Sequence, residues 1–179
     1  MRVVSGNYGG RPLKTLPGKT TRPTTDKVKG AIFNMIGPYF DGGLVLDLFA
    51  GSGSLSIEAV SRGMDEAVLV ERDRQAQAII LENIQMTKEA EKFELMKMSA
   101  EKVLTMLSKK FDLILLDPPY AKEQIEKNLL IMQERELLSA TVTVVCETDK
   151  SVELSETIGN LHLVKQKIYG ISKISIYEF

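Results

Sequence analysis

The sequence predicts a doubly wound α/β fold around a mostly parallel sheet with helices on both faces. Short apolar runs rich in Leu, Val and Ile alternate with longer stretches of helical periodicity, as in parallel strands covered on both faces. The length of 179 residues, 44% of them hydrophobic, suits one domain over residues 1–179. At the C-terminal end two strands are separated by only about two residues, and so short a connection permits only an antiparallel pair.

The first 23 residues differ from the core expected at residues 24–179. They are rich in Gly, Pro and Thr, which predicts a loosely built arm or a hairpin. Residues 1–30 contain seven basic residues and one acidic residue, a balance of +6, so the rest carries −7 of the net charge of −1. This asymmetry favours a local contact with a polyanion, although a solvated arm without a partner fits the charge equally well.

The first regular element is a helix that begins near residue 24. Thr24, Thr25 or Asp26 can cap its start, and Gly37-Pro38 ends it. Its apolar face comprises Val28, Ile32, Met35 and Ile36.

Strands and helices then alternate to the end of the chain. Strands are expected at residues 44–49, 67–71, 93–98, 111–116 and 141–147, and helices near 54–62, 73–88, 100–108 and 123–135. The segments 161–170 and 172–179 form the final antiparallel pair, which makes a sheet of seven strands.

A glycine-containing turn, "DLFAGSGSLSIEA", follows the first strand. Gly51 and Gly53 allow close backbone approach at the start of the next helix. A dinucleotide site would have a third glycine where this chain has Ser56, and Asp47 would repel a phosphate. The turn therefore favours a ligand with a cationic or zwitterionic part.

The second strand ends in an acid, Glu71. An acid about 20 residues after such a turn typically accepts hydrogen bonds from ribose hydroxyls. A nucleoside without phosphates and with a charged amino-acid tail describes S-adenosylmethionine. The turn and Glu71 together predict this cofactor.

The fourth strand ends in Asp117-Pro118-Pro119-Tyr120, in "FDLILLDPPYAKEQ". A carboxylate and a rigid proline carbonyl can each accept one N–H of an exocyclic amino group and orient its lone pair. Tyr120 can stack on the base. Because ligands of open α/β sheets bind at the carboxyl ends of the strands, this loop is expected beside the cofactor.

Three motifs, "DLFAGSG", "VERD" and "DPPY", resemble those of the Rossmann-like S-adenosylmethionine-dependent amino-methyltransferases. The segments "RVVSGNYGGRPLKT", "RPTTDKVKGAIFNMI" and "DLFAGSGSLSIEAVSRG" further resemble the RsmD-type bacterial enzymes, over nearly the whole chain. The resemblance implies methylation of N2 of a guanine in 16S ribosomal RNA, with naked RNA or an assembling small subunit as partner.

The resemblance also assigns roles to residues by position. It makes residues Asp117, Pro118, Pro119 and Tyr120 the catalytic loop. It places the cofactor against Asp47, Phe49, Ala50, Gly51, Gly53, Glu71, Arg72, Ser99 and Ala100. Ser99 stands where relatives often have an acid against the adenine. It places RNA near Arg11, Lys14, Arg22, Thr24, Thr25, Asp26 and Lys27.

Other targets remain open at this stage, because "DPPY" also suits adenine N6 in DNA or RNA, cytosine N4 or a protein glutamine. A nicotinamide-dependent oxidoreductase is disfavoured by the missing third glycine, and a non-catalytic RNA-binding module by the intact Asp117 and Glu71.

No metal site is expected. The single cysteine, Cys146, lies in an apolar run and predicts a buried, inert thiol. With no membrane span or signal peptide expected, we predict a cytoplasmic protein, active as a monomer.

Overall fold

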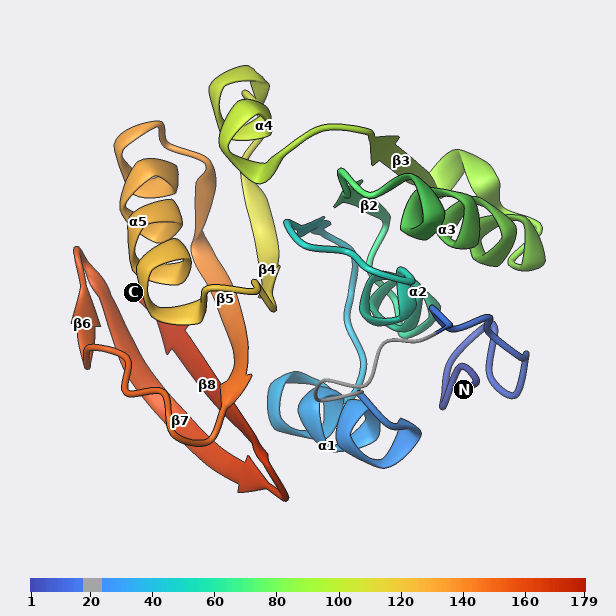
Figure 1. Cartoon of the computed structure of the whole chain (residues 1–179), viewed down its shortest axis with the longest axis horizontal. Helices are drawn as coiled ribbons and strands as arrows, with labels where there is room; N and C mark the ends of the chain where they lie inside the picture. The colour runs from blue at the N-terminus through green and yellow to red at the C-terminus, as the bar shows by residue number, and fades with distance from the viewer. Residues whose placement is uncertain (18–23) are drawn as a thin grey trace.

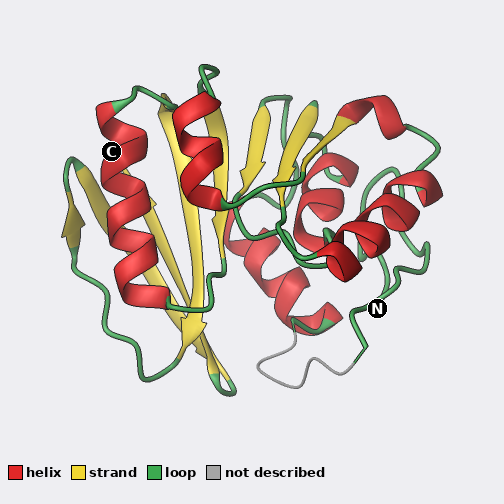
Figure 2. Cartoon of the chain, turned by 45° about the horizontal axis from the view of Figure 1, so that its top comes forward, coloured by secondary structure: helices red, strands yellow, loops and turns green. Residues whose placement is uncertain are grey.

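A computed structural model of the chain describes residues 1–17 and 24–179. These residues form one eight-stranded sheet in the order β3-β2-β1-β4-β5-β8-β7-β6, with helices on both faces (Figures 1 and 2). The strands are β1 (Leu44–Asp47), β2 (Glu66–Val70), β3 (Phe93–Met96), β4 (Phe111–Leu116), β5 (Leu138–Asp149), β6 (Thr157–Ile158), β7 (Leu161–Tyr169) and β8 (Ser172–Glu178). The helices are α1 (Asp26–Ile36), α2 (Ser54–Ser61), α3 (Arg74–Met86), α4 (Ala100–Met106) and α5 (Ala121–Glu134), with a 3-10 turn at Ala90–Lys92.

Strands β1 to β5 are parallel, so their carboxyl ends meet at one side of the sheet, which we call the carboxyl edge. Strand β8 lies antiparallel between β5 and β7. Strand β7 therefore runs in the same direction as β5, and the two-residue turn Gly170-Ile171 that joins β7 to β8 also lies at the carboxyl edge. This confirms the predicted antiparallel pair and its short connection.

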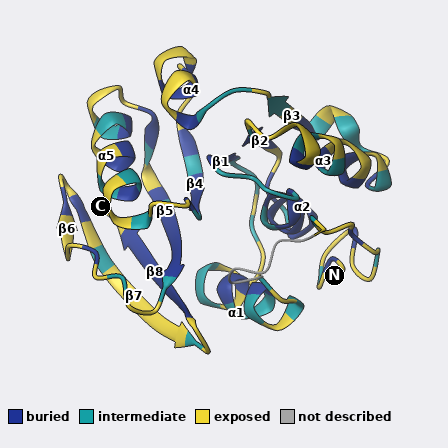
Figure 3. Ribbon diagram, viewed as in Figure 1, coloured by how far each residue is buried: buried dark blue, intermediate teal, exposed yellow. Residues whose placement is uncertain are grey.

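Each face of the sheet has its own hydrophobic core. One core contains α4 and α5 with Leu46 and Ile114 of the central strands. The other contains α1, α2, α3 and the amino-terminal segment, with Val45 and Leu113. Successive strand residues point to opposite faces, so the continuous apolar runs of the central strands fill both cores. Figure 3 shows the buried central strands between partly exposed helices.

The predicted helix near residue 24 is confirmed as α1. Its cap is Thr25, whose hydroxyl accepts the N–H of Val28 at 3.2 Å. The sheet has eight strands within the described residues rather than the expected seven. The extra strand, β6, has only two residues and pairs with the start of β7, so its apolar pattern was too short to predict a strand.

Of the two predictions for the amino-terminal segment, a loose arm or a hairpin, the structure shows the hairpin over residues 1–17. Residues 1–17 form a hairpin in which the N–H of Val3 donates to the carbonyl of Arg11 at 3.0 Å and the N–H of Leu13 to that of Met1 at 2.8 Å. Val3, Tyr8 and Leu13 are buried in the core. We call residues 1–17 the amino-terminal hairpin. Three buried apolar anchors are enough to fix a segment whose other residues are mostly polar, Gly or Pro.

A buried ionic cluster around Glu58 of α2 holds this hairpin. The Glu58 carboxylate accepts the N–H groups of Val4 and Ser5 at 2.9 and 3.0 Å. It also pairs with Arg62 at 2.7 Å and with Lys29 of α1 at 3.4 Å, and all three charged side chains are buried. Burial lowers the pKa of Lys29, and the charge of Glu58 opposes this shift. The cluster joins the hairpin, α1 and α2.

Two further expectations concern the chain as a whole. Cys146 is buried, and burial raises the pKa of its thiol, as expected of an inert cysteine. Among the helices of the described residues, none combines the length and the apolar character needed to cross a membrane.

Candidate active site

Three acidic residues gather at the carboxyl edge, on three neighbouring strands. Asp47 ends β1, Asp117 directly follows β4, and Glu147 lies near the end of β5. The strand registers pair Asp47 with Leu115 and Leu116 with Cys146, so the three acids occupy adjacent places along this edge. The Asp-Pro-Pro-Tyr loop therefore lies at the end of the fourth strand, beside the end of the first, as expected.

Asp47 is only 3% exposed and receives a 2.6 Å hydrogen bond from the Ser56 hydroxyl of α2. The pKa of Asp47 is raised to about 7, mainly by burial, which the Ser56 hydroxyl opposes. The negative charges of Asp117 and Glu71 contribute to the rise, and the Phe49 N–H opposes it. A carboxyl group with a pKa near neutral loses its proton readily when a cation approaches. The site therefore favours a cationic ligand group.

The glycine turn between β1 and α2 has the backbone that the sequence predicted. Gly51 and Gly53 have positive φ angles of 60° and 81°, which only glycine adopts without strain. A Cβ on Gly53 would lie 3.1 Å from Leu69 Cδ2, whereas the space beside Gly51 is open. The turn thus packs against β2 on one side and leaves room for a ligand on the other.

Glu71 connects this turn to the segment after β2. Its carboxylate accepts the N–H of Gly51 at 2.9 Å and the N–H of Asp73 at 2.9 Å. Each carboxylate oxygen has a further lone pair for another donor. Arg72, the next residue, is exposed. Glu71 therefore lies where the spacing predicted, and it fixes the turn as well.

Ser99, where the resemblance led us to expect an acid, caps helix α4. Its hydroxyl accepts the N–H of Lys102 at 3.2 Å. Ser and Asp are both good N-cap residues, so the exchange preserves the start of the helix. Ala100, the first helical residue, is buried.

The predicted catalytic loop begins with partly buried residues and ends with an exposed ring. Pro118 is buried and Asp117 is half-buried. Tyr120 is 73% exposed, and its N–H is held by the Gln124 side chain at 2.9 Å. The two prolines hold the chain direction, so the tyrosine ring projects from a fixed backbone at the start of α5.

Of the predicted RNA-binding residues, several hold the amino-terminal hairpin in place. Arg11 donates to the carbonyl of Thr87 at 3.0 Å, and its guanidinium lies 5.4 Å from the centroid of the Tyr8 ring. Lys14 pairs with Glu82 at 2.7 Å. These two basic side chains are thus engaged with the protein itself.

The remaining predicted RNA-binding residues lie near the start of α1. The Thr24 hydroxyl binds the buried carboxylate of Glu147, at 2.9 and 3.2 Å to its two oxygens. Asp26 accepts the N–H of Arg2 at 3.1 Å, and Lys27 is exposed. Arg22 lies outside the described residues. The start of α1 is therefore attached to the carboxyl edge beside Asp117.

A sequence-family model described as "Conserved hypothetical protein 95" matches residues 1–178. The chain belongs to this family. Its members include the RsmD type that the motifs resemble. The chain is 44% identical to "Putative rRNA methyltransferase YlbH" of Bacillus subtilis, over 99% of this chain and 98% of that protein. It is 33% identical to "Ribosomal RNA small subunit methyltransferase D" of Haemophilus influenzae, over 99% and 93%.

The fold of this family is also seen in solved structures. "Putative methyltransferase yhhF from Escherichia coli" is 25% identical, has a TM-score of 0.87, and the match covers 99% of this chain and 96% of that chain. The Rossmann-like methyltransferase fold expected from the sequence is therefore confirmed.

Sequence reasoning missed three side chains that organise the site of this family member. Ser56 was read only as a missing glycine, although a hydroxyl nine residues after Asp47 can face it across a strand–helix turn. Glu147 carried no motif. Asn83 of α3 accepts the N–H of Lys14 at 2.8 Å and donates to the carbonyl of Ser52 at 2.9 Å, which ties the hairpin to the glycine turn. No local pattern identifies such a bridge.

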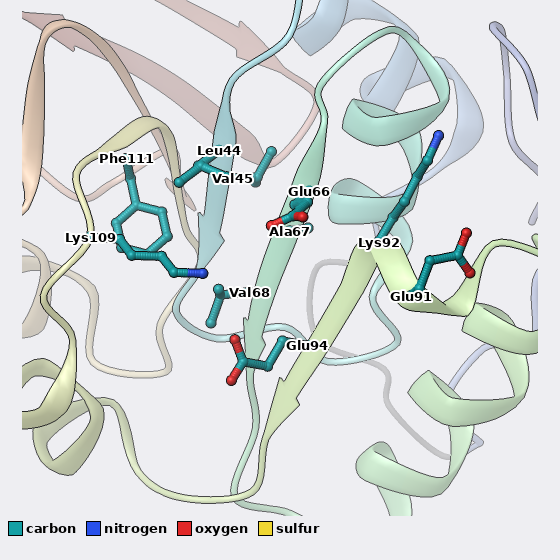
Figure 4. A pocket seen from close by; sticks show the side chains of 10 residues that line it. All are labelled: Leu44, Val45, Glu66, Ala67, Val68, Glu91, Lys92, Glu94, Lys109 and Phe111. Atoms are coloured by element: carbon teal, nitrogen blue, oxygen red, sulfur yellow. The ribbon is translucent and has the colours of Figure 1, made fainter.

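A small cavity of about 110 Å³ lies elsewhere, at the amino ends of the strands (Figure 4). Its walls include Leu44, Glu66 and Phe111, which begin or nearly begin β1, β2 and β4, and the charged residues Glu94 and Lys109. Parallel strands place their amino and carboxyl ends on opposite sides of the sheet. This cavity is therefore separate from the carboxyl edge and its three acids.

Proposed function

We propose that this protein is an S-adenosylmethionine-dependent methyltransferase that modifies the exocyclic N2 amino group of a guanine in small-subunit ribosomal RNA. The observation that carries the proposal is the place of Asp117 beside the buried Asp47 at the carboxyl edge. One acid is suited to a cationic cofactor and the next to an amino group. Relatives named as ribosomal RNA methyltransferases support the substrate class.

The residues around the glycine turn fit the cofactor. S-adenosylmethionine, when bound, supplies a methyl group on a positively charged sulfur. Asp47 provides a carboxylate whose charge a cation would stabilise, and Glu71 can accept ribose hydroxyls with its remaining lone pairs. The other cofactor contacts that we propose are Phe49, Ala50, Gly51, Gly53, Arg72, Ser99 and Ala100.

Asp117 and the Pro118 carbonyl would each accept one N–H of the target amino group. This holds the nitrogen with its lone pair toward the methyl group, and Asp117 stabilises the positive charge that develops on nitrogen. Nitrogen loses its proton readily once alkylated, so no strong base is required. The exposed ring of Tyr120 would stack on the base and hold it out of its helix.

RNA would reach this loop across the start of α1 and the amino-terminal hairpin. We assign the contacts to Arg11, Lys14, Arg22, Thr24, Thr25, Asp26 and Lys27. Because Arg11 and Lys14 also hold the hairpin, their contribution includes placing the surface as well as neutralising phosphate. We further propose that the enzyme works in the cytoplasm as a single-domain monomer, without a metal, on naked RNA or on an assembling subunit.

Mass spectrometry of ribosomal RNA from a strain that lacks this gene tests the function. We expect one N2-methylguanine to disappear from small-subunit RNA and to return with the wild-type gene but not with Asp117→Asn. Loss of an N6-methyladenine instead would favour the adenine reading of the same loop. Unchanged modification of all nucleic acids would contradict the proposal.

A further inference from the structure

The β7–β8 hairpin is a second basic segment, distant in sequence from the first. Residues 161–178 contain three lysines, one histidine and a single acid, Glu178, at the end of β8. Lys173 is buried and donates to the carbonyl of Val152 at 2.8 Å. Lys165 and Lys167 are exposed, and neither forms an ion pair with any residue that the structure describes. Because the rest of the chain beyond residue 30 is acidic on balance, this local excess of positive charge stands out.

The hairpin is fixed against α1. Lys165 Nζ donates to the carbonyl of Met35 at 3.4 Å, and the Tyr169 hydroxyl lies 3.7 Å from Met35 Sδ. Lys167 Nζ lies 5.5 Å from the centroid of the Tyr169 ring. The same helix α1 begins at Asp26, two residues after Thr24, whose hydroxyl binds Glu147 beside the catalytic loop. One rigid helix therefore connects the active site to the hairpin.

The tip of the hairpin extends past the end of β5 at the carboxyl edge. Ser172 pairs with Asp149, the last residue of β5, and the N–H of Lys150 donates to the carbonyl of Ile171 at 2.8 Å. Figures 1 and 2 show the tip on the same side of the sheet as α1, with the amino-terminal hairpin on the opposite flank of α1. Helix α1, whose start is attached to the carboxyl edge, thus lies between two basic segments.

The side chains at the tip are open to solvent. Ile168 and Ile171 are each 55% exposed, and Lys150 is exposed beside them. The nearby Asp149 carboxylate accepts the N–H and the hydroxyl of Ser151, at 3.0 and 2.7 Å. We call Lys150, Lys167, Ile168 and Ile171 the hairpin tip.

We propose that the hairpin tip is a second RNA-binding surface that contacts the phosphate backbone flanking the target nucleotide. The inference rests on the proposed function. Lys150 and Lys167 supply positive charge for phosphates, and Ile171 in the turn supplies apolar surface for an unstacked base or a sugar. Two basic surfaces on either side of α1 would hold an RNA so that it crosses Asp117. One surface alone could not fix the orientation of the RNA.

The lysines have a competing explanation. Strand β6 covers only Leu161 and His162 of β7, and the Leu163 N–H donates to the carbonyl of Glu156 at 2.8 Å. Beyond Leu163, no strand of the described residues pairs with the outer edge of β7. Lysines on such an edge commonly prevent association with another sheet. The two explanations differ in what neutralising the lysines would change.

The test is the double variant Lys150→Gln/Lys167→Gln, with Lys109→Gln/Lys110→Gln as control, since both control lysines are exposed at the opposite edge. Binding of naked small-subunit ribosomal RNA is measured against salt concentration. We expect the tip variant to lower the log–log salt slope by roughly 1.4–1.8, at about 0.7–0.9 for each lost phosphate contact. Cofactor affinity should not change, and the control should keep the wild-type slope.

An unchanged slope in the tip variant, with or without new aggregation, would overturn the inference and favour the edge explanation. Failure of the wild-type protein itself to bind or methylate the RNA would instead overturn the proposed function, and the inference with it. A lower slope in the control as well would show that binding depends only on net charge, which also contradicts a specific surface.

Discussion

The Ser56 hydroxyl donates a 2.6 Å hydrogen bond to the buried carboxylate of Asp47. In a dinucleotide fold this helix position is a glycine that lets the helix approach the strand. Here the helix approaches and brings a hydroxyl that partly offsets the cost of burying an acid. Asp47 and Ser56 together make this turn suited to a cation rather than to a phosphate.

Binding of S-adenosylmethionine should tighten as the pH rises through the pKa of Asp47, about 7. Only the deprotonated carboxylate attracts a cation, so binding competes with the proton. Between pH 6 and 7.5 the deprotonated fraction rises close to tenfold, and affinity should rise by roughly the same factor. Isothermal titration in two buffers of different ionisation enthalpy would detect the released proton. Asp47→Asn should abolish the pH dependence, and its persistence in that variant would contradict the assignment.

Ser56→Ala should shift this pH profile to higher pH. The Ser56 hydroxyl lowers the pKa of Asp47 by stabilising its charged form, so removing it raises that pKa further. Ala is small and helix-compatible, so the fold should persist. Titration of the cofactor at pH 6, 7 and 8 is the measurement. A uniform weakening at every pH would mean that Ser56 acts only through packing.

Asp117→Asn should reduce the single-turnover methylation rate by roughly 10²-fold or more, because the amide carries no charge to stabilise the developing cation. The amide oxygen still accepts a hydrogen bond, so RNA affinity should change little. Quenched-flow methylation of small-subunit RNA, with cofactor binding measured in parallel, separates the two effects. Near wild-type rates would show that the loop serves only to end strand β4.

Tyr120→Ala should weaken RNA binding as well as rate, because it removes a stacking surface worth about 1–3 kcal/mol per base. Since the ring is exposed, its removal should leave the unfolding temperature nearly unchanged. Tyr120→Phe keeps the ring and should restore most of the activity. A Phe variant as poor as the Ala variant would assign the role to the hydroxyl instead.

Glu58→Gln should destabilise the protein by about 3 kcal/mol or more, since Lys29 and Arg62 would remain buried without their counter-charge. For a chain of this length that corresponds to a loss of roughly 6–12 °C in Tm. The control Glu82→Gln breaks the exposed pair with Lys14 and should cost less than about 1 kcal/mol. Equal Tm losses in the two variants would show that burial of the cluster has no special effect.

The sequence by itself determined the fold class, the parallel direction of the central strands and the place of Asp47, Glu71 and Asp117 at strand ends. Apolar periodicity is a local property, and so are the turn residues Gly51 and Gly53 and the prolines after β4. Because parallel strands align their ends, local patterns were enough to bring Asp47, Glu71 and Asp117 together.

Only the tertiary structure decided which polar side chains meet. Thr24 and Glu147 are 123 residues apart, and Glu58 binds partners from two other segments. The packing of the amino-terminal hairpin and the position of the β7–β8 tip beside α1 also depend on the assembled sheet. Such contacts have no period or motif, because a buried charge is tolerated wherever folding supplies a partner. The sequence between the two partners carries no signal of how close they lie in the fold.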